Sequence, residues 1–310
     1  MVTDTDLAPD IAHVRNSLTQ IKPTAGTITF RVINTIVLTV ITLVTLYPFV
    51  NLIAKAFSSD AEISAAHVNL WPRGFTTTTF HAVLTNPTFW RDYGNTVTYT
   101  VVGTIISMLI TTTFAYAISR QHLRGKAFFV GLAVFTMFFS GGLIPNYLLV
   151  TQTLHMKNTI WAIVLPGALS VFNLLVMKSF FENFPQELEE AAALDGMSTY
   201  GIFFKIVVPL SKAVIATMTL FYAVGYWNSW FSAFVYLDDK KLFPVMIYLR
   251  NLMSGAMGTT DISGNASDAP AIGQNVQSVA MLLTVLPIVC VYPFVQKYFV
   301  SGVMLGSVKG

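Results

Sequence analysis

Charge is scarce in this sequence. Asp, Glu, Lys and Arg make up 11% of the 310 residues, whereas hydrophobic residues make up 54% and the mean hydropathy is +0.62. A soluble domain carries about 25% charged residues to keep its surface in water. The net charge of +3 is also too small to favour a nucleic-acid partner. The composition therefore excludes a disordered chain and predicts an integral membrane protein.

Cysteine and the common catalytic motifs are missing as well. The single cysteine, Cys290, cannot form a disulfide within the chain and lies inside a hydrophobic run, where it is most simply a packing residue. The sequence has no G-x-x-x-x-G-K-[ST] phosphate loop, no H-E-x-x-H zinc motif and no G-x-S-x-G nucleophile elbow. We therefore expect no catalytic residue, no metal site and no nucleotide site in this chain.

Six runs without charged residues are long enough to cross a bilayer. A helix needs roughly 20 apolar residues to span the hydrocarbon, whereas barrel strands show short alternating segments. We expect an all-α integral membrane protein whose six spans lie at residues 32–54, 93–119, 127–150, 158–177, 213–237 and 276–296. Prolines and glycines within the spans, most clearly in residues 141–146, predict packing kinks or hinges.

The basic residues orient the spans. The connection after the second span holds Arg120, Arg124 and Lys126 and no acid, whereas the next connection holds Lys157 alone. Because short basic loops stay in the cytoplasm, we place both termini inside. Residues 1–29 then form a cytoplasmic tail, since they lack the features of a signal peptide, and residues 30–310 form the transmembrane domain.

The outer loop at residues 238–275 divides into two parts. Residues 242–253 predict a short interfacial helix, whereas residues 254–273 are rich in Gly, Ser, Thr, Asp and Pro and predict flexible chain. A loop this long is often functional. Contact with a partner protein and a solvated insertion both stay open.

Acidic residues concentrate in the cytoplasmic connection at residues 182–209. Asn183 is suited to cap one short helix and either Ser198 or Thr199 to cap a second, and Gly196 between them can adopt the left-handed conformation that ends the first. We expect a helix–glycine–helix elbow that offers a shallow face to a partner. That face would contain Phe184, Leu188, Ala191 and Ala192. An interfacial amphipathic helix is the alternative, although such helices usually carry Lys and Arg where this one carries Glu.

The same connection resembles the EAA loop of ABC importer permeases. Glu190-Ala191-Ala192, Gly196 after three residues and Ile206-Val-Val-Pro209 after nine more match the family spacing, with Val208 where leucine is usual. Met156-Lys157-Asn158-Thr159 and residues 296–310 are similar to the carbohydrate-uptake branch. Within that branch the chain resembles the second permease of maltose-type importers, closest to the complex-oligosaccharide subgroup.

This resemblance implies a permease of a binding-protein-dependent sugar importer in the bacterial cytoplasmic membrane. Such a chain is not an enzyme and holds no cofactor, because ATP and Mg²⁺ are bound by a partner ATPase. The implied partners are a second permease, two cytoplasmic ABC ATPases, an extracellular or periplasmic solute-binding protein and an oligosaccharide. The implied ATPase-coupling residues are Glu190, Ala191, Ala192, Asp195, Gly196 and Pro209. Two alternatives stay open: an ABC permease for a non-sugar solute, and an ion-coupled secondary transporter, which would usually carry ionisable residues inside its spans.

Polar and aromatic residues inside the spans are candidates for the substrate path. Sugars offer hydroxyls to amides and C–H faces to aromatic rings. The candidates are Asn146, Tyr147, Asn173, Tyr222, Tyr226, Trp227, Asn228 and Trp230. For the aromatic group around Asn228, a belt at the membrane boundary is the alternative.

Overall fold

The computed structural model describes residues 24–254 and 273–303, and of residues 294–303 the backbone alone. Most of the predicted N-terminal tail, most of the flexible half of the outer loop and the end of the C-terminal motif lie outside these residues. All regular elements of the described residues are helices, and these residues contain no β-strand. The all-α prediction is therefore confirmed for this part of the protein.

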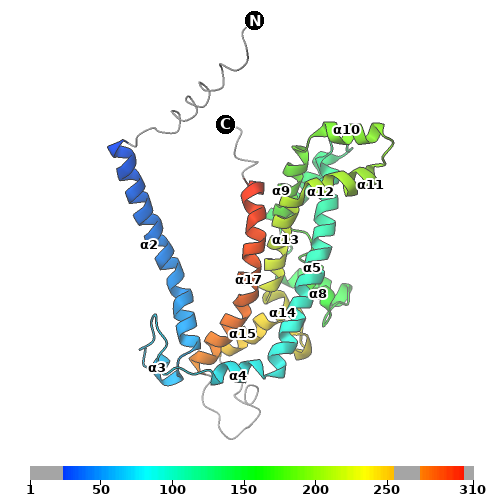
Figure 1. The fold of residues 1–310 in the computed structure, drawn as a ribbon. Helices are drawn as coiled ribbons and strands as arrows, with labels where there is room; N and C mark the ends of the chain where they lie inside the picture. The colour runs from blue at the N-terminus through cyan, green and yellow to red at the C-terminus, as the bar shows by residue number, and fades with distance from the viewer. Residues whose placement is uncertain (1–23, 255–272, 304–310) are drawn as a thin grey trace.

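Three helices are long and apolar enough to cross a membrane: α2 (Ala25–Ala56), α5 (Pro87–Ser119) and α17 (Gln274–Val303). Helices α5, α13 (Lys212–Trp227) and α17 pack together, whereas α2 leans away from α17 toward its own N-terminal end (Figure 1). Large apolar side chains are exposed along the whole of α2. Such a helix is suited to lipid or to another subunit rather than to the core of this chain.

Two bent helix pairs raise the number of spans to five if each pair counts as one. Helix α6 (Lys126–Phe138) is followed by α7 (Leu143–Leu148) and η1 (Leu149–Thr153) at an angle of 111°. The segment Thr199–Leu210 meets α13 at 82°. This segment comprises α11 (Thr199–Ile202), η2 (Phe203–Val207) and α12 (Val208–Leu210). The count of six spans stays a prediction.

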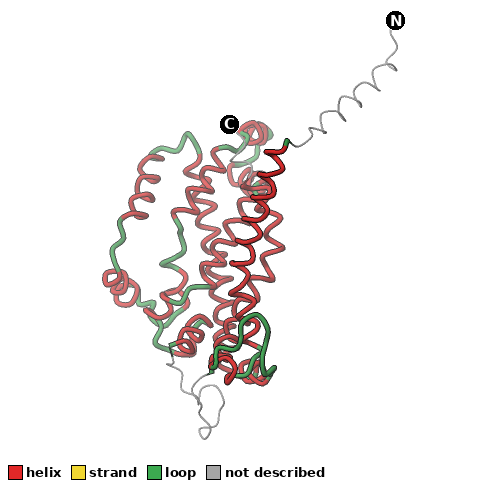
Figure 2. The backbone as a smooth tube through the Cα atoms, turned by 90° about the vertical axis from the view of Figure 1, so that its left-hand side faces the viewer, coloured by secondary structure: helices red, strands yellow, loops and turns green. Residues whose placement is uncertain are grey.

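The third, fourth and fifth predicted spans are wrong as single helices. The third breaks at residues 139–142, where Gly142 adopts a φ of +85°, as the glycines there predict. The fourth divides into α8 (Ile160–Val164) and α9 (Val171–Glu182) on either side of Pro166. The fifth divides into α13 and α14 (Phe231–Tyr236). Figure 2 shows the breaks as loop segments running between helices.

Short helices close the two ends of the bundle. At one end lie α3 (Asp60–Ser64), α4 (Thr78–Leu84), η3 (Lys240–Leu242) and α15 (Val245–Met253). Helix α15 confirms the short helix predicted in the outer loop. At the opposite end lies α10 (Gln186–Leu194) together with α11, and the N-terminal end of α2 and the C-terminal end of α17 point the same way (Figure 1). We call this the elbow end.

Each end has its own hydrophobic core, and α5 reaches both. At the elbow end, Ala115, Tyr116 and Ile118 of α5 pack among residues of α9, α10, η2 and α13. At the other end, Phe89 of α5 packs with residues of α4, α15 and α17, including Tyr248. Between the cores, α5 turns small and hydroxylated residues toward α13, which lets the two helices approach closely. Helix α5 is therefore the continuous element that connects the ends.

Candidate functional site

The predicted helix–glycine–helix elbow is present, but one of its two predicted helix caps is wrong. Helix α10 ends at Leu194 with Asp195 as its C-cap, Gly196 follows with a φ of +79°, and the Ser198 hydroxyl accepts a hydrogen bond from the Gly201 amide at the start of α11. Asn183 does not cap α10. Its amide is still bonded into α9, and its side chain donates back to the Ser179 carbonyl, so Pro185 takes the position before α10.

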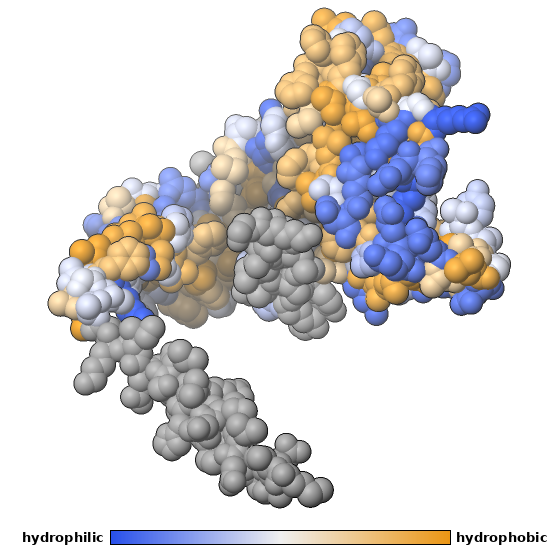
Figure 3. Space-filling model, turned by 90° about the horizontal axis from the view of Figure 1, so that it is seen from above, coloured by the Kyte–Doolittle hydropathy of each residue, from blue (hydrophilic) through white to orange (hydrophobic). Residues whose placement is uncertain are grey.

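The predicted shared face of the elbow is wrong. Phe184 and Ala192 are buried, whereas Leu188 and Ala191 are exposed, because Phe184 lies before the start of α10 and the helix turns the other two outward. Leu194 is also 89% exposed. We call Leu188, Ala191 and Leu194 the outer face of α10. Seen from above, hydrophilic residues gather on the elbow side of the molecule, beside hydrophobic surface (Figure 3).

Five of the six predicted coupling residues are accessible. Glu190, Ala191, Asp195, Gly196 and Pro209 are all exposed. Only Ala192 is buried, within the core at the elbow end. A partner at this end could therefore contact most of the motif without any rearrangement of the chain.

Glu189 attaches the underside of α10 to α5. One carboxylate oxygen lies 2.6 Å from Nη1 of Arg120, and the other accepts a hydrogen bond of 3.0 Å from the Tyr116 hydroxyl. Arg120 also donates from Nη2 to the Phe181 carbonyl at 2.7 Å, near the end of α9. Its guanidinium lies 4.7 Å from the centre of the Tyr116 ring, as in a cation–π contact.

A second charged group joins α6 to α9. Glu182 accepts from Lys126 at 2.7 Å and from Lys178 at 2.8 Å. Burial alone would raise the pKa of Glu182, but the hydrogen bonds and charges of the two ammonium groups outweigh it and hold the pKa below its ordinary value. A hollow of about 360 Å³ lies between these groups and α10, with Arg120, Glu182 and Glu189 among the residues that line it.

Tyr226 of α13 lies between α5 and the break in the fourth span. Its hydroxyl donates to the Val164 carbonyl at 3.0 Å and lies 3.0 Å from the Ser107 hydroxyl, which is then the donor of that second bond. The ring packs directly over Gly103 of α5. Tyr226 is buried and satisfies a backbone group that the broken helix leaves free.

Tyr222 supports the other side of the same break. Its hydroxyl accepts from the Ser170 amide at 3.0 Å and lies 2.6 Å from the Thr111 hydroxyl. Trp227 is also buried, and its Nε1 donates to the Thr284 carbonyl of α17. These three predicted substrate-path residues therefore bond to other helices of the same chain.

The other five predicted path residues have differing surroundings. Asn146 and Asn228 are exposed, and Trp230 is 38% exposed and lies beside the guanidinium of Arg250. Tyr147 stacks on the ring of Tyr236 at 6.2 Å. Asn173 is buried in the first turn of α9. The assignment of all eight residues to a substrate path stays a prediction.

Comparison with known proteins decides the family. Protein LplC of Bacillus subtilis (strain 168) is 40% identical over 281 residues, which cover 91% of this chain and 95% of LplC. The polygalacturonan/rhamnogalacturonan transport system permease protein YtcP of the same strain is 40% identical over 271 residues, 86% of this chain and 94% of YtcP. No protein-family model matches the chain.

A solved structure agrees with these relatives. It is the crystal structure of a bacterial ABC transporter involved in the import of the acidic polysaccharide alginate. The TM-score is 0.81 at 30% identity, with coverage of 89% of this chain and 98% of that one. This chain belongs to the permease subunits of ABC importers. Such permeases are not enzymes and work with a second permease, with ATPases and with a binding protein.

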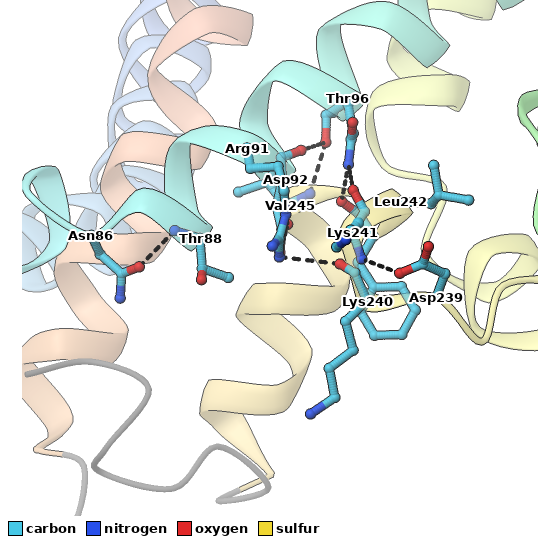
Figure 4. A network of polar contacts seen from close by, with 12 residues as sticks. Asn86, Thr88, Arg91, Asp92, Thr96, Asp239, Lys240, Lys241, Leu242 and Val245 are labelled. Carbon is cyan, nitrogen blue, oxygen red and sulfur yellow. Dashed lines mark hydrogen bonds and ion pairs between the residues drawn. The ribbon is translucent and has the colours of Figure 1, made fainter. Parts of the chain in front are cut away.

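At the end of the permease opposite the elbow, α5 holds the segment at residues 237–243, which we call the strap. Arg91 donates to the Lys240 carbonyl at 3.1 Å, Asn95 to the carbonyls of Lys241 and Phe243 at 2.8 and 3.0 Å, and Tyr99 to that of Leu242 at 2.7 Å. Figure 4 shows α5 side chains beside the strap. Four successive carbonyls are thus bonded to one face of one helix.

Asn158 holds the strap from a second direction. Its Oδ1 accepts from the amides of Asp238 and Asp239, and its backbone has a φ of +56°, which asparagine tolerates better than most residues. No contact with the strap was predicted from the sequence for Arg91, Asn95, Tyr99 or Asn158. A spacing of four residues from Arg91 to Asn95 to Tyr99 was the available signal, since it places all three on one helix face.

Proposed function

We propose that this permease carries an oligosaccharide across the bacterial cytoplasmic membrane, and that fragments of an acidic polysaccharide are the first candidates. The names of YtcP and of the alginate transporter support this choice, since both refer to acidic sugar polymers. The exposed amides of Asn146 and Asn228 are suited to sugar hydroxyls. We further propose six spans, in which α8 and α9 together form the sixth span beside the five counted above.

The elbow end is proposed to face the cytoplasm. The connection between α5 and α6 carries Arg120, Arg124 and Lys126 and lies at this end, in keeping with the excess of basic residues in cytoplasmic loops. The N-terminal end of α2 and the C-terminal end of α17 point to the same side, which supports cytoplasmic termini (Figure 1).

Docking of an ATPase on the elbow is the central step of the proposal. The observation that carries it is the outer face of α10, where Leu188 and Leu194 are exposed at the water-facing end of the chain beside the exposed Glu190. Exposed apolar side chains at such a position indicate a protein contact. ATP and Mg²⁺ would be bound by the ATPase, whose closure would press on the elbow.

Loss of the ATPase from elbow variants tests the proposal. We expect Glu190→Lys and Gly196→Asp to insert normally and to lose the ATPase on detergent pull-down, because the first reverses an exposed charge and the second strains a left-handed turn. Glu62→Lys, a charge reversal at the opposite end, is the matched control and should retain the ATPase. Retention of ATPase binding and transport in both elbow variants would contradict the proposal.

The substrate class has a separate test. The solute-binding protein of the purified complex should be stabilised against heating by uronate-containing oligosaccharides more than by neutral ones. A shift with neutral oligosaccharides alone would remove the acidic class. A shift with peptides or polyamines alone would overturn the sugar assignment.

A further inference from the structure

Two neighbouring glutamates of α10 face different sides of the helix. Glu190 is exposed, whereas the side chain of Glu189 is 13% exposed and its two oxygens are bonded to Tyr116 in the last turn of α5 and to Arg120 directly after it. Consecutive helical residues lie about 100° apart around the axis, so one can meet a partner while the other meets the bundle. The elbow thus has a receiving side and an attached side.

Arg120 is the group that holds the attached side. Its Nη1, Nη2 and Nε each donate, to Glu189 of α10, to the Phe181 carbonyl of α9 and to the Ser119 hydroxyl of α5. The guanidinium is a rigid planar fork, so three bonds at once fix the relative positions of the three helices. Arg120 is only 25% exposed, and removal of one member of such a pair would leave the other charge without compensation.

Within the described residues, this is the one ion pair that involves α10. The nearby pairs of Glu182 with Lys126 and Lys178 join α6 and α9 and do not reach α10. Glu182 therefore stiffens the same end without attaching the elbow. This difference makes Lys126 a matched control for Arg120.

Helix α5 connects this attachment to the far end of the permease. It is continuous over 33 residues and has no proline beyond its first position, so it is about 50 Å long. Midway it meets Tyr222 and Tyr226 of α13, and at its other end it holds the strap. A displacement of its last turn can therefore reach the strap without crossing a break.

We propose that Arg120 and Glu189 are positioning residues that transmit movement of the elbow to α5, and through α5 to the strap at residues 237–243. This rests on the proposed docking of an ATPase at the elbow. Glu190 contacts the ATPase, and Glu189 transmits the resulting movement of α10 to α5 through its bonds to Arg120 and Tyr116. The hollow between Arg120, Glu182 and α10 gives the connection between α5 and α6 room to adjust while the ion pair stays closed.

The test uses the complete complex of permeases, ATPases and binding protein in nanodiscs. The ATPases are trapped with ATP and vanadate, and amide hydrogen exchange is measured in the strap before and after trapping. In the wild-type complex we expect trapping to change exchange in the strap. In Arg120→Ala and Glu189→Gln we expect the ATPases to remain bound and trapped, while the change in the strap falls about fivefold or more.

Two further variants separate transmission from general damage. Lys126→Ala should retain the wild-type response, because it breaks an ion pair at the same end that does not reach α10. The exchanged pair Arg120→Glu with Glu189→Arg should recover part of the response. If the exchanged pair does not accumulate, Tyr116→Phe replaces it, since it removes one bond to Glu189 and should reduce the response less than Arg120→Ala.

Several results would overturn the inference. These are a wild-type strap that does not respond, an unchanged response in Arg120→Ala, an equal loss in Lys126→Ala, no recovery in the exchanged pair, or an equal loss in Tyr116→Phe. Loss of the ATPases from Arg120→Ala would also count against it, because Arg120 would then shape the docking surface. Failure of the proposed function is distinguishable, since it would appear as retention of the ATPase by Glu190→Lys.

Discussion

Replacement of Gly103 by alanine tests the contact between α5 and α13. A Cβ atom at this position would lie 2.7 Å from two ring carbons of Tyr226 and 2.8 Å from a third. Carbon atoms in contact normally lie about 3.5–4.0 Å apart, so the ring would have to move. The ring has little freedom to do so, because its hydroxyl is bonded to Ser107 and to the Val164 carbonyl at 3.0 Å each.

The expected cost combines two losses and one gain. Forcing an extra methyl group into a packed site costs about 1–3 kcal/mol. Displacement of the hydroxyl from the Val164 carbonyl adds about 0.5–1.5 kcal/mol. Alanine gains up to about 1 kcal/mol over glycine inside a helix. Gly94 lies in the same helix, and a methyl group added there would have nothing within 4 Å. Gly94→Ala should therefore show only the gain in helix stability. The free energies of unfolding of the two variants should differ by the sum of the two losses at Gly103.

The assay is thermal unfolding of the purified permease in detergent, compared as apparent midpoints at one heating rate because such unfolding is often irreversible. We expect Gly103→Ala to unfold at least about 3 °C below Gly94→Ala. In a Tyr226→Leu background the cost of Gly103→Ala should shrink, since the ring it meets is gone. Equal midpoints for the two alanine variants would refute the close approach of α5 and α13.

Three further predictions concern single side chains. Glu182 has a folded pKa below its ordinary value of 4.5, so its ion pairs stabilise the fold by about 0.5 kcal/mol above that pH, and this contribution is lost as the pH falls through the folded pKa. The unfolding midpoint of Glu182→Gln should lack this dependence between about pH 3 and pH 6. Parallel curves of midpoint against pH for the variant and the wild type would contradict the ion pairs. Asn95→Ala removes the donor to two strap carbonyls and should speed amide exchange in the strap, at a cost of about 1 kcal/mol; unchanged exchange would show that the strap does not depend on α5. Asn158→Ala should be less stable than Asn158→Gly, because both lose the bonds to the strap but only alanine bears about 1–2 kcal/mol of left-handed strain; the reverse order would exclude that strain.

The helical class and the elbow could be predicted because both depend on local sequence. Lack of charge over long runs requires helices in lipid, and Gly196 followed by Ser198 specifies a stop and a new start within three residues. The Asn183 cap failed although its residue type was suitable. Asparagine is suited both to the end of one helix and to the start of the next. Here the Asn183 amide is bonded to the carbonyls of Ser179 and Phe180, so the residue belongs to the end of α9.

The positions of the breaks were partly predictable, whereas their consequences were not. Gly142 and Pro166 mark two of the three interruptions, as expected for residues that weaken or remove helix hydrogen bonds. The third break, at residues 228–230, contains neither proline nor glycine, although Gly225 lies in the last turn of α13. None of the three breaks contains a charged residue, because a break in a span is buried against other helices or lines a cavity.

Tyr222 and Tyr226 show why polar residues in a span do not by themselves identify a substrate path. A hydroxyl in a span must find a partner, and the sequence does not say whether that partner is a ligand or a carbonyl freed elsewhere. Here the break between Val164 and Ser170 supplies a free carbonyl and a free amide, and one tyrosine bonds to each. The break and the tyrosines are about 60 residues apart in sequence, so neither predicts the other. The exposed Asn146 and Asn228 do not cap this break, although Asn228 donates to the Val224 carbonyl of its own helix, and they are consequently the better candidates for contact with the sugar.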